Sequence, residues 1–348
     1  MIAVGIASAG LANDFKGKHT KEKTIRKEFN VNPDALLKIN NSYGNLVLNS
    51  WNEDRVVIEV HITVNGSSEK KVDQRLEEIT VEFDASMDMV SAKTRFNKGS
   101  GWNWSGKNVN MQINYNIKMP IKNSVHLSND YGNIILDRVD GHAKISCDYG
   151  RLDLGELRGR NNQLSFDYTS KSKIGYMNSG EIRADYSGFT IGKTGDLLLR
   201  ADYTNAAIEE MENLDYSCDY GSLEVGSLNN VIGRGDYINV KFGTIHGNVD
   251  IQADYGGIQI DEMAQDAGNI DISTDYTGIK IGYNPAYNFD FEISSEYAGV
   301  KGKEDLEINV SKEKSSERYY SGYYGSPNSG NTVTIKSDYG NINLRKNQ

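Results

Sequence analysis

The sequence is short of the residues that disulfide-rich domains, metal centres and catalytic sites depend on. Among 348 residues there are 2 Cys, 4 Pro and 5 His. Two cysteines exclude a scaffold held by several disulfides and a zinc cluster with cysteine ligands. No two histidines have the spacing of metal ligands on one helix face or in neighbouring repeats, so they predict no metal site. Catalytic and nucleotide-binding motifs are lacking, and we expect neither enzyme activity nor a cofactor.

Positive charge and long apolar runs are also scarce. The chain has 38 Lys and Arg against 48 Asp and Glu, a formal charge of −10 and a pI of about 5.1. This balance argues against nucleic acid as a partner and against electrostatic attachment to acidic lipid. No segment is apolar for long enough to cross a bilayer as a helix.

Residues 1–12 are uncharged, small and apolar. This composition is typical of the end of a secretory signal peptide, and an ordinary buried strand is the alternative. We therefore expect an exported protein that is periplasmic, associated with the outer membrane, or extracellular.

Glycine and tyrosine are abundant, with 35 and 21 copies, and tyrosine marks an internal repeat. The pair Asp-Tyr, once Glu-Tyr, recurs eleven times at steps of 17–21 residues, with a last step of 42. That last step is either two fused periods or one period with an insertion. Apolar and polar residues alternate on both sides of each pair, which indicates β-strands. The repeat tyrosines are Tyr131, Tyr149, Tyr168, Tyr186, Tyr203, Tyr220, Tyr237, Tyr255, Tyr276, Tyr297 and Tyr339.

A unit of about 18 residues is too small to bury a core alone, so the repeats must stack and share one. The sequence predicts an all-β fold, a single-stranded parallel β-solenoid similar to a right-handed β-helix with about 18 residues per turn. Residues 13–65 form N-terminal strands and a first turn around Tyr43, and residues 120–348 form the repeat solenoid. Between them, residues 66–119 form an insertion of one helix and further strands. Arg345 then protects an exposed last strand at the end of the stack.

These features resemble a known group of bacterial proteins. The segments that carry the resemblance are INNSYGNLVLNSW, RVVIEVHITV, the helical insertion, NYNIKMPIKNSVHLSNDYGNIIL and the serial DYG units. From about residue 24 the chain is similar to the bacterial "putative adhesin" solenoid domains and to the auto-transporter adhesin head (GIN) domains of Bacteroidetes. The resemblance implies an exported β-solenoid and brings no catalytic residues with it.

Stacking the repeats in register predicts two columns of side chains. The tyrosines share the parity of the inward apolar residues, so we expect an internal aromatic spine. The acidic residues point outward, and each is expected to accept backbone N–H groups of its own turn. A row of weak divalent-cation sites is the alternative for this acidic column. The residues considered for it are Asp130, Asp148, Asp185, Asp202 and Asp219.

The two cysteines occupy equivalent positions four repeats apart. Cys147 and Cys218 each precede a repeat tyrosine by two residues. Four steps of about 4.8 Å place them roughly 19 Å apart, whereas a disulfide needs Cα atoms within about 7 Å. Both are therefore predicted to be free, buried thiols.

Ligand-binding residues are expected where the repeat is interrupted. One interruption is the Gly-rich loop with Trp102 and Trp104, and the other is the loop insertion at residues 311–331. Both have compositions typical of recognition loops, and folding back onto the scaffold is the alternative. The candidate tyrosines of the second segment are Tyr319, Tyr320, Tyr323 and Tyr324.

The sequence therefore favours an exported, non-catalytic β-solenoid that binds a glycan or a cell-surface protein. A polysaccharide-active β-helix enzyme is one alternative, although the carboxylates are spread over the repeats rather than paired at one place. A structural or envelope-stress accessory protein with a protein partner is the other.

Overall fold

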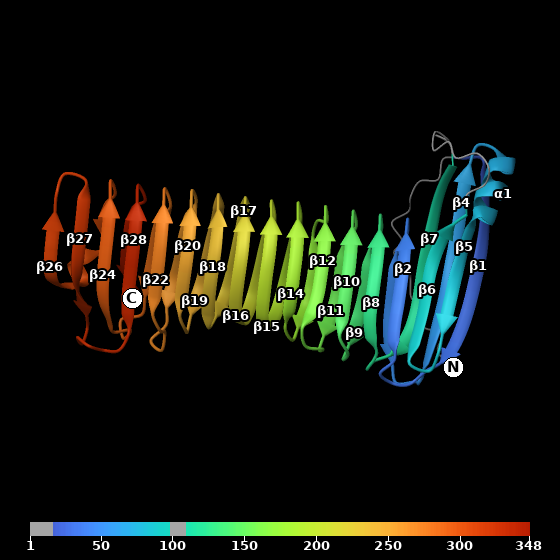
Figure 1. Cartoon of the computed structure of the whole chain (residues 1–348), viewed down its shortest axis with the longest axis horizontal. Helices are drawn as coiled ribbons and strands as arrows, with labels where there is room; N and C mark the ends of the chain where they lie inside the picture. The colour runs from blue at the N-terminus through green and yellow to red at the C-terminus, as the bar shows by residue number, and fades with distance from the viewer. Residues whose placement is uncertain (1–16, 98–108) are drawn as a thin grey trace.

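The computed structural model describes residues 17–97 and 109–348. Within these ranges the chain is all-β, as predicted, with one α-helix and a long, mostly parallel sheet. Figure 1 shows the strands side by side along one long axis, with the N-terminal strands at one end and β26 and β27 at the other. No helix in the described ranges has the length and apolarity that a bilayer crossing requires.

Each repeat contributes two strands that meet at the repeat tyrosine. We refer to the strand that ends just before the tyrosine as the leading strand and to the next one as the trailing strand. Both pair in register with parallel strands of neighbouring repeats. The leading strands are β2 (Leu36–Ser42), β8 (Ser124–Asp130), β10 (Ala143–Asp148), β12 (Asn162–Asp167), β14 (Gly180–Asp185), β18 (Asn230–Asp236), β20 (Val249–Asp254), β22 (Ile270–Asp275), β24 (Phe289–Glu296) and β28 (Thr332–Asp338).

The trailing strands are β3 (Leu46–Trp51), β9 (Ile134–Val139), β11 (Leu152–Leu157), β13 (Ser172–Met177), β17 (Gly221–Leu228), β19 (Ile238–Ile245), β21 (Gly257–Met263), β23 (Gly278–Tyr283), β25 (Val300–Lys301) and β29 (Ile342–Lys346). Two longer strands, β15 (Gly188–Asp202) and β16 (Asn205–Asp219), each run from a trailing strand into the next leading strand. The stack is therefore built from a repeating unit of one leading and one trailing strand.

The core lies between the leading and the trailing strands, because apolar residues alternate with polar ones along each strand. In β10, for example, Ala143, Ile145 and Cys147 are buried, whereas Lys144 faces solvent. One continuous cluster of buried side chains extends from the N-terminal strands to β29. Each repeat thus completes the core of its neighbours, which it could not do alone.

The residue after a repeat tyrosine is small, with the exception of Ile238, because neighbouring backbones approach closely there. A Cβ on Gly150 would lie 2.0 Å from the carbonyl oxygen of Gly132. Where threonine stands instead, as at Thr204, its buried hydroxyl donates to the carbonyl oxygens of Ala184 and Asp202 at 2.9 Å each. Small residues at this position therefore let the backbones touch and satisfy carbonyl groups at the corner.

At the N-terminal end, the order of strands along the axis differs from their order in the sequence. The pair β2–β3 lies between β8–β9 on one side and β6 and β7 on the other. Antiparallel pairing then adds β5 to the leading side, and β4 and β1 to the trailing side. The single helix, α1, packs against β1 and β4. The bounds are β1 (His19–Asn30), β4 (Arg55–Gly66), α1 (Glu69–Glu78), β5 (Ile79–Ala85), β6 (Met89–Phe96) and β7 (Val109–Pro120).

The C-terminal end is interleaved in the same way. The last two strands, β28 and β29, insert between β22–β23 and the earlier pair β24–β25, as Figure 1 shows for β28. The prediction of an exposed last strand guarded by Arg345 is therefore wrong. A hairpin of β26 (Glu307–Glu313) and β27 (Glu317–Tyr324) pairs with β24 and ends the stack. The step of 42 residues is one period that carries this hairpin.

Candidate functional site

A column of twelve tyrosines follows the corner between the leading and the trailing strands. We refer to it as the tyrosine ladder. Neighbouring ring centroids lie 4.6–5.3 Å apart, and neighbouring ring planes lie within 9° of parallel. The column is continuous through both interleaved ends, because Tyr43 stacks on Tyr131 and Tyr339 stacks between Tyr276 and Tyr297.

The ladder faces solvent, so the prediction of an internal aromatic spine is wrong. Apart from Tyr43, the ladder side chains are 43–59% exposed. All twelve residues have a positive φ of 50–65°. This left-handed conformation turns the chain at the tyrosine and resets the two-residue alternation of inward and outward side chains. The three-residue gap between most of these tyrosines and the next apolar residue facing the core is the sequence signal of that reset.

Tyrosine is an uncommon residue at a left-handed backbone position. A residue with a Cβ costs about 1–2 kcal/mol in this conformation, which glycine avoids. Each contact between stacked aromatic rings contributes about 0.5–1.5 kcal/mol. An interior ladder tyrosine makes two such contacts, so stacking offsets the strain of the corner.

The ladder presents ring edges and hydroxyl groups rather than ring faces. Each interior ring is covered on both sides, as Tyr203 is by Tyr186 and Tyr220 with centroids 4.8 and 4.7 Å away. Desolvation, and then neighbouring tyrosines and aspartates, raises the pKa of Tyr220, so its hydroxyl stays protonated at neutral pH. The edge of an aromatic ring is electropositive. The ladder is therefore a row of donors suited to oxygen acceptors and a poor platform for stacking sugar rings face-on.

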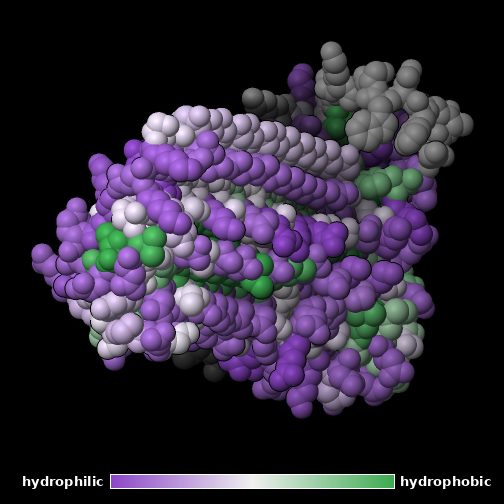
Figure 2. Space-filling view, turned by 60° about the vertical axis from the view of Figure 1, so that its left-hand side comes forward, coloured by the Kyte–Doolittle hydropathy of each residue, from purple (hydrophilic) through white to green (hydrophobic). Residues whose placement is uncertain are grey.

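An acidic row of the residues before the tyrosines runs beside the ladder. Figure 2 shows how stacking in register gathers side chains of similar hydropathy into continuous rows along the long axis. The carboxylates are bonded by the next repeat rather than by their own turn, which corrects the prediction. Oδ1 of Asp167 accepts the backbone N–H of Asp185 at 3.1 Å, and Oδ1 of Asp219 accepts that of Asp236 at 2.8 Å. Desolvation, and then the adjacent aspartates, raises the pKa of Asp236 and Asp275.

The acidic row was also considered for cations, at Asp130, Asp148, Asp185, Asp202 and Asp219. Four of these carboxylates accept a backbone N–H from the following repeat, at 2.8–3.4 Å. In the two described ranges no three acidic, histidine or cysteine side chains gather as a metal site requires. Cation binding along the row stays a prediction that chelation would test.

The four tyrosines of the C-terminal insertion lie in strand β27 rather than in a loop, and their role in binding stays a prediction. Tyr320 and Tyr324 are buried, and the hydroxyl of Tyr320 donates to Glu313. These two side chains cover the end of the core. Tyr319 and Tyr323 lie on the other face of β27 and are partly exposed. Only these two are placed to meet a ligand without a change in the fold.

The remaining residues singled out by the sequence are cysteines and tryptophans. Cys147 and Cys218 are free and buried, as predicted. Burial raises the pKa of both thiols to about 12. Trp102 and Trp104 lie outside the described residues, so their role in binding stays a prediction.

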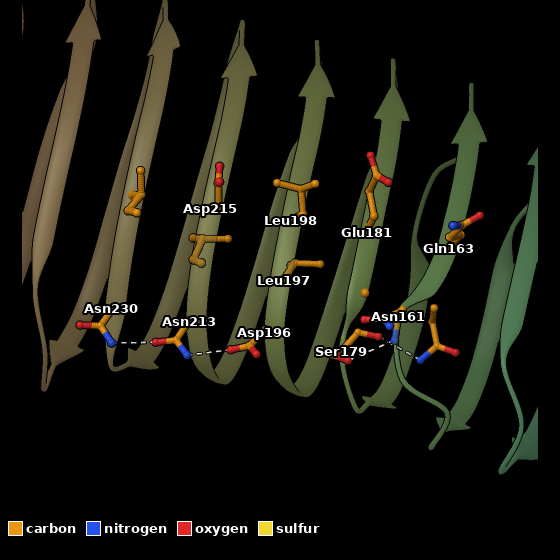
Figure 3. A pocket seen from close by; sticks show the side chains of 14 residues that line it. Asn161, Gln163, Ser179, Glu181, Asp196, Leu197, Leu198, Asn213, Asp215 and Asn230 are labelled. Carbon is orange, nitrogen blue, oxygen red and sulfur yellow. Dashed lines mark hydrogen bonds between the residues drawn. The ribbon is translucent and has the colours of Figure 1, made fainter.

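A groove of about 670 Å³ crosses the outer face of the leading strands near the middle of the stack (Figure 3). Glu181 and Asp215 line it at one register position, two strands apart with Leu198 between them. Their Cα atoms are therefore roughly 10 Å apart, and each carboxylate is paired with an arginine. Arg183 lies 2.7 Å from Glu181, and Arg200 lies 3.2 Å from Asp215. A glycosidase needs one carboxylate free to give a proton and another free to act as a base or nucleophile. The groove therefore lends no support to the alternative of a polysaccharide-cleaving enzyme.

Two groups of neighbours escaped the sequence analysis. At the second corner, Nδ2 of Asn213 donates to Asp196 and Nδ2 of Asn230 donates to Asn213, both at 2.7 Å. The recurrence of Asn or Asp at steps of 17 residues is the signal for this amide ladder. The rings of His126 and His142 lie 6.3 Å apart, although their spacing in the sequence suggested no contact. About one repeat of sequence separates them, and residues one repeat apart lie side by side in this fold.

No family model matches this sequence, and no curated protein matches it. Among solved structures, it is similar to a protein described as a "putative adhesin" from Parabacteroides distasonis, with 9% identity, a TM-score of 0.37, and coverage of 96% of this chain and 98% of that one. A "putative adhesin" from Parabacteroides merdae has 11% identity, a TM-score of 0.33, and coverage of 92% and 96%. A "Putative lipid binding protein" from Parabacteroides distasonis has 13% identity, a TM-score of 0.28, and coverage of 74% and 94%.

Proposed function

We propose that the protein is an exported, non-catalytic β-solenoid scaffold that binds a ligand of the cell surface or matrix along the tyrosine ladder. The ladder is the observation that carries this proposal. Eleven steps of about 4.8 Å make it roughly 50 Å long. Soluble monomers seldom expose a continuous aromatic surface of this extent unless a partner uses it, and tyrosine is enriched in interfaces.

The chemistry of the ladder favours an extended, oxygen-rich and uncharged ligand. Its hydroxyl groups and ring edges are donors repeated at every strand. The acidic row beside it repels anionic ligands, because like charges across an interface cost affinity. A neutral glycan chain lying along the ladder meets both conditions.

Removing ladder hydroxyl groups tests the proposal while keeping the rings stacked. The variant replaces Tyr186, Tyr203, Tyr220 and Tyr237 with phenylalanine, and Tyr176→Phe, on a trailing strand outside the ladder, is the matched control. Binding of the intact chain to a glycan array and to whole cells is measured. Losing four hydrogen bonds of about 0.5–1.5 kcal/mol each should weaken binding at least tenfold. Unchanged binding by the fourfold variant would remove the ladder as the binding surface.

A protein-binding accessory role is the second candidate, and the outermost strand β26 favours it. All seven residues of β26 are exposed, including Ile308 and Val310, which are 40% and 38% exposed. In the described parts of the chain β26 pairs only with β27, so one backbone edge is open to strand addition. Replacing Ile308 with lysine should abolish capture of such a partner in a pull-down, because an edge charge blocks pairing. Capture that is retained by this variant would rule out the β26 edge.

A further inference from the structure

A second groove, nearer the N-terminal end, collects positive charge in an otherwise acidic protein. It has a volume of about 560 Å³ and crosses the outer face of β2, β8, β10, β12 and β14. Lys38, His126 and Lys144 line it at one register position on three neighbouring strands. We refer to it as the basic groove. Since parallel strands lie about 4.8 Å apart, it offers one basic group at each strand spacing.

The two lysines of the basic groove lack a counter-ion within the protein. In the described ranges neither Lys38 nor Lys144 forms a salt bridge, whereas Arg183 at the far end of the groove pairs with Glu181 at 2.7 Å. Both lysine side chains are exposed. Their charge is therefore available to a ligand at no cost in broken ion pairs.

The basic groups that surround His126 affect its protonation. It is half-buried between the two lysines, and its ring lies 6.3 Å from that of His142. Burial first, and then repulsion by His142, Lys144 and Lys38, lowers the pKa of His126. A bound anion would relieve this repulsion and raise the pKa of His126, so this pKa reports whether an anion occupies the groove.

A row of uncharged polar groups runs parallel to the basic groups. It lies two residues further along the same strands, on the same face, and also lines the groove. Hydroxyl and amide groups of this kind bond to sugar hydroxyl groups without selecting charge. Four of the five strands therefore offer a neutral polar group in this row, and three of those four also carry a basic group. The row consists of Asn40, Ser128, Ser146 and Ser165.

We propose that the basic groove binds a linear acidic polysaccharide. Carboxylate or sulfate groups of successive sugar residues would meet Lys38, His126 and Lys144, and sugar hydroxyl groups would meet the row of uncharged polar groups. Nucleic acid fits less well, because three basic groups on a chain of net charge −10 compensate few backbone phosphates. The groove lies on the outer face of the leading strands, where its uncharged polar row stands two residues before the acidic row and three before the tyrosine ladder. Neither the acidic row nor the ladder lines the groove, and its binding does not depend on the ladder.

Calorimetric titration of the intact chain at low salt tests this proposal. The probes are polygalacturonate, uncharged dextran, inorganic phosphate alone and duplex DNA. We expect polygalacturonate to bind and the double variant Lys38→Gln, Lys144→Gln to raise its Kd about tenfold. The control is Lys173→Gln, which removes one lysine charge from an exposed position on trailing strand β13, and it should leave the Kd unchanged. Circular dichroism checks that each variant keeps its strands.

Several results would overturn the proposal. Equal weakening by Lys173→Gln would mean diffuse attraction rather than a site in the groove. Phosphate alone binding as tightly as polygalacturonate would assign the groove to a small free anion, and tighter binding of DNA would assign it to nucleic acid. Binding should also raise the pKa of His126 in an NMR titration. Polygalacturonate binding that leaves this pKa unchanged would place the ligand elsewhere.

Discussion

At Tyr203, in the middle of the ladder, glycine should be tolerated better than alanine. In an ordinary strand the order is reversed, because glycine loses more chain entropy on folding, by about 0.5–1 kcal/mol. Tyr203 has a φ of 51° and stacks on Tyr186 and Tyr220. The comparison therefore separates the strain of the corner from the gain of stacking.

The expected differences in stability follow from the energy of stacking and the strain of the left-handed backbone. Alanine loses both stacking contacts, about 1–3 kcal/mol in total, and keeps the left-handed strain. Glycine loses the same contacts and recovers about 1–2 kcal/mol of strain. After its entropy cost is subtracted, the glycine variant should be roughly 1 kcal/mol more stable than the alanine variant. Phenylalanine keeps both contacts and should differ from tyrosine by less than about 0.5 kcal/mol.

Equilibrium unfolding in urea measures these differences, with midpoints compared at equal slopes. The centre of the stack is the right place for the test, because each repeat contacts only its neighbours and a central defect weakens two interfaces. The reasoning fails if Tyr203→Ala is as stable as Tyr203→Gly or more so. A loss of more than about 1 kcal/mol in Tyr203→Phe would show instead that the hydroxyl has a bonding partner.

The remaining predictions concern the acidic row, the core and the thiols. Asp167→Asn keeps the oxygen that accepts a backbone N–H and should be as stable as wild type or more stable at pH 7, whereas Asp167→Ala should lose about 1 kcal/mol. Desolvation raises the folded-state pKa of Asp167 above 3.8, and the backbone hydrogen bond opposes this only in part. The wild-type protein should therefore gain stability as pH falls through the raised pKa, because the folded state then binds the proton more tightly than the unfolded state. Asp167→Asn should lack that gain when urea unfolding is measured at several pH values. Tyr216→Phe should stabilise the protein by about 1 kcal/mol in urea unfolding, because the buried hydroxyl has no hydrogen-bond partner among the described residues. Gly233→Ala should destabilise it in the same assay, because the added Cβ would lie 2.2 Å from the Tyr216 ring. Cys147 and Cys218 should resist a thiol reagent at pH 8 until the protein unfolds, because burial raises both pKa values to about 12. A chelator should leave the melting temperature unchanged, and a large drop would instead favour cations on the acidic row.

The repeat made the strands predictable from the sequence. Alternation of apolar and polar residues sets which side of each strand faces the core, and a constant period sets which residues are neighbours. The environment of Cys147 and Cys218 follows from these two rules alone. The rules hold only while the backbone stays extended, so they gave the wrong side for the tyrosines, where φ changes sign.

The two ends of the stack were beyond this reasoning because their pairing is not periodic. Asn41 donates to the carbonyl oxygen of Ile113 at 3.0 Å although 72 residues separate them, and Ile113 lies in an insertion that does not share the repeat. The basic groove depends on another long-range pairing, since Lys38 meets His126 only when β2 lies beside β8 across that insertion. Sites that join distant segments need the three-dimensional register, whereas sites built within successive repeats can be read from the period.

The interleaved C-terminal strands have a consequence for how the protein reaches its final form. A chain emerging during synthesis can wind repeat upon repeat as far as β23, but the place between β22 and β24 stays vacant until β28 has emerged. The stack is then latched at this end, because the strands that arrive later, β28 and β29, lie inside the earlier ones. We expect chains truncated before β28 to fray from that end, and protease sensitivity confined there would reveal the missing latch.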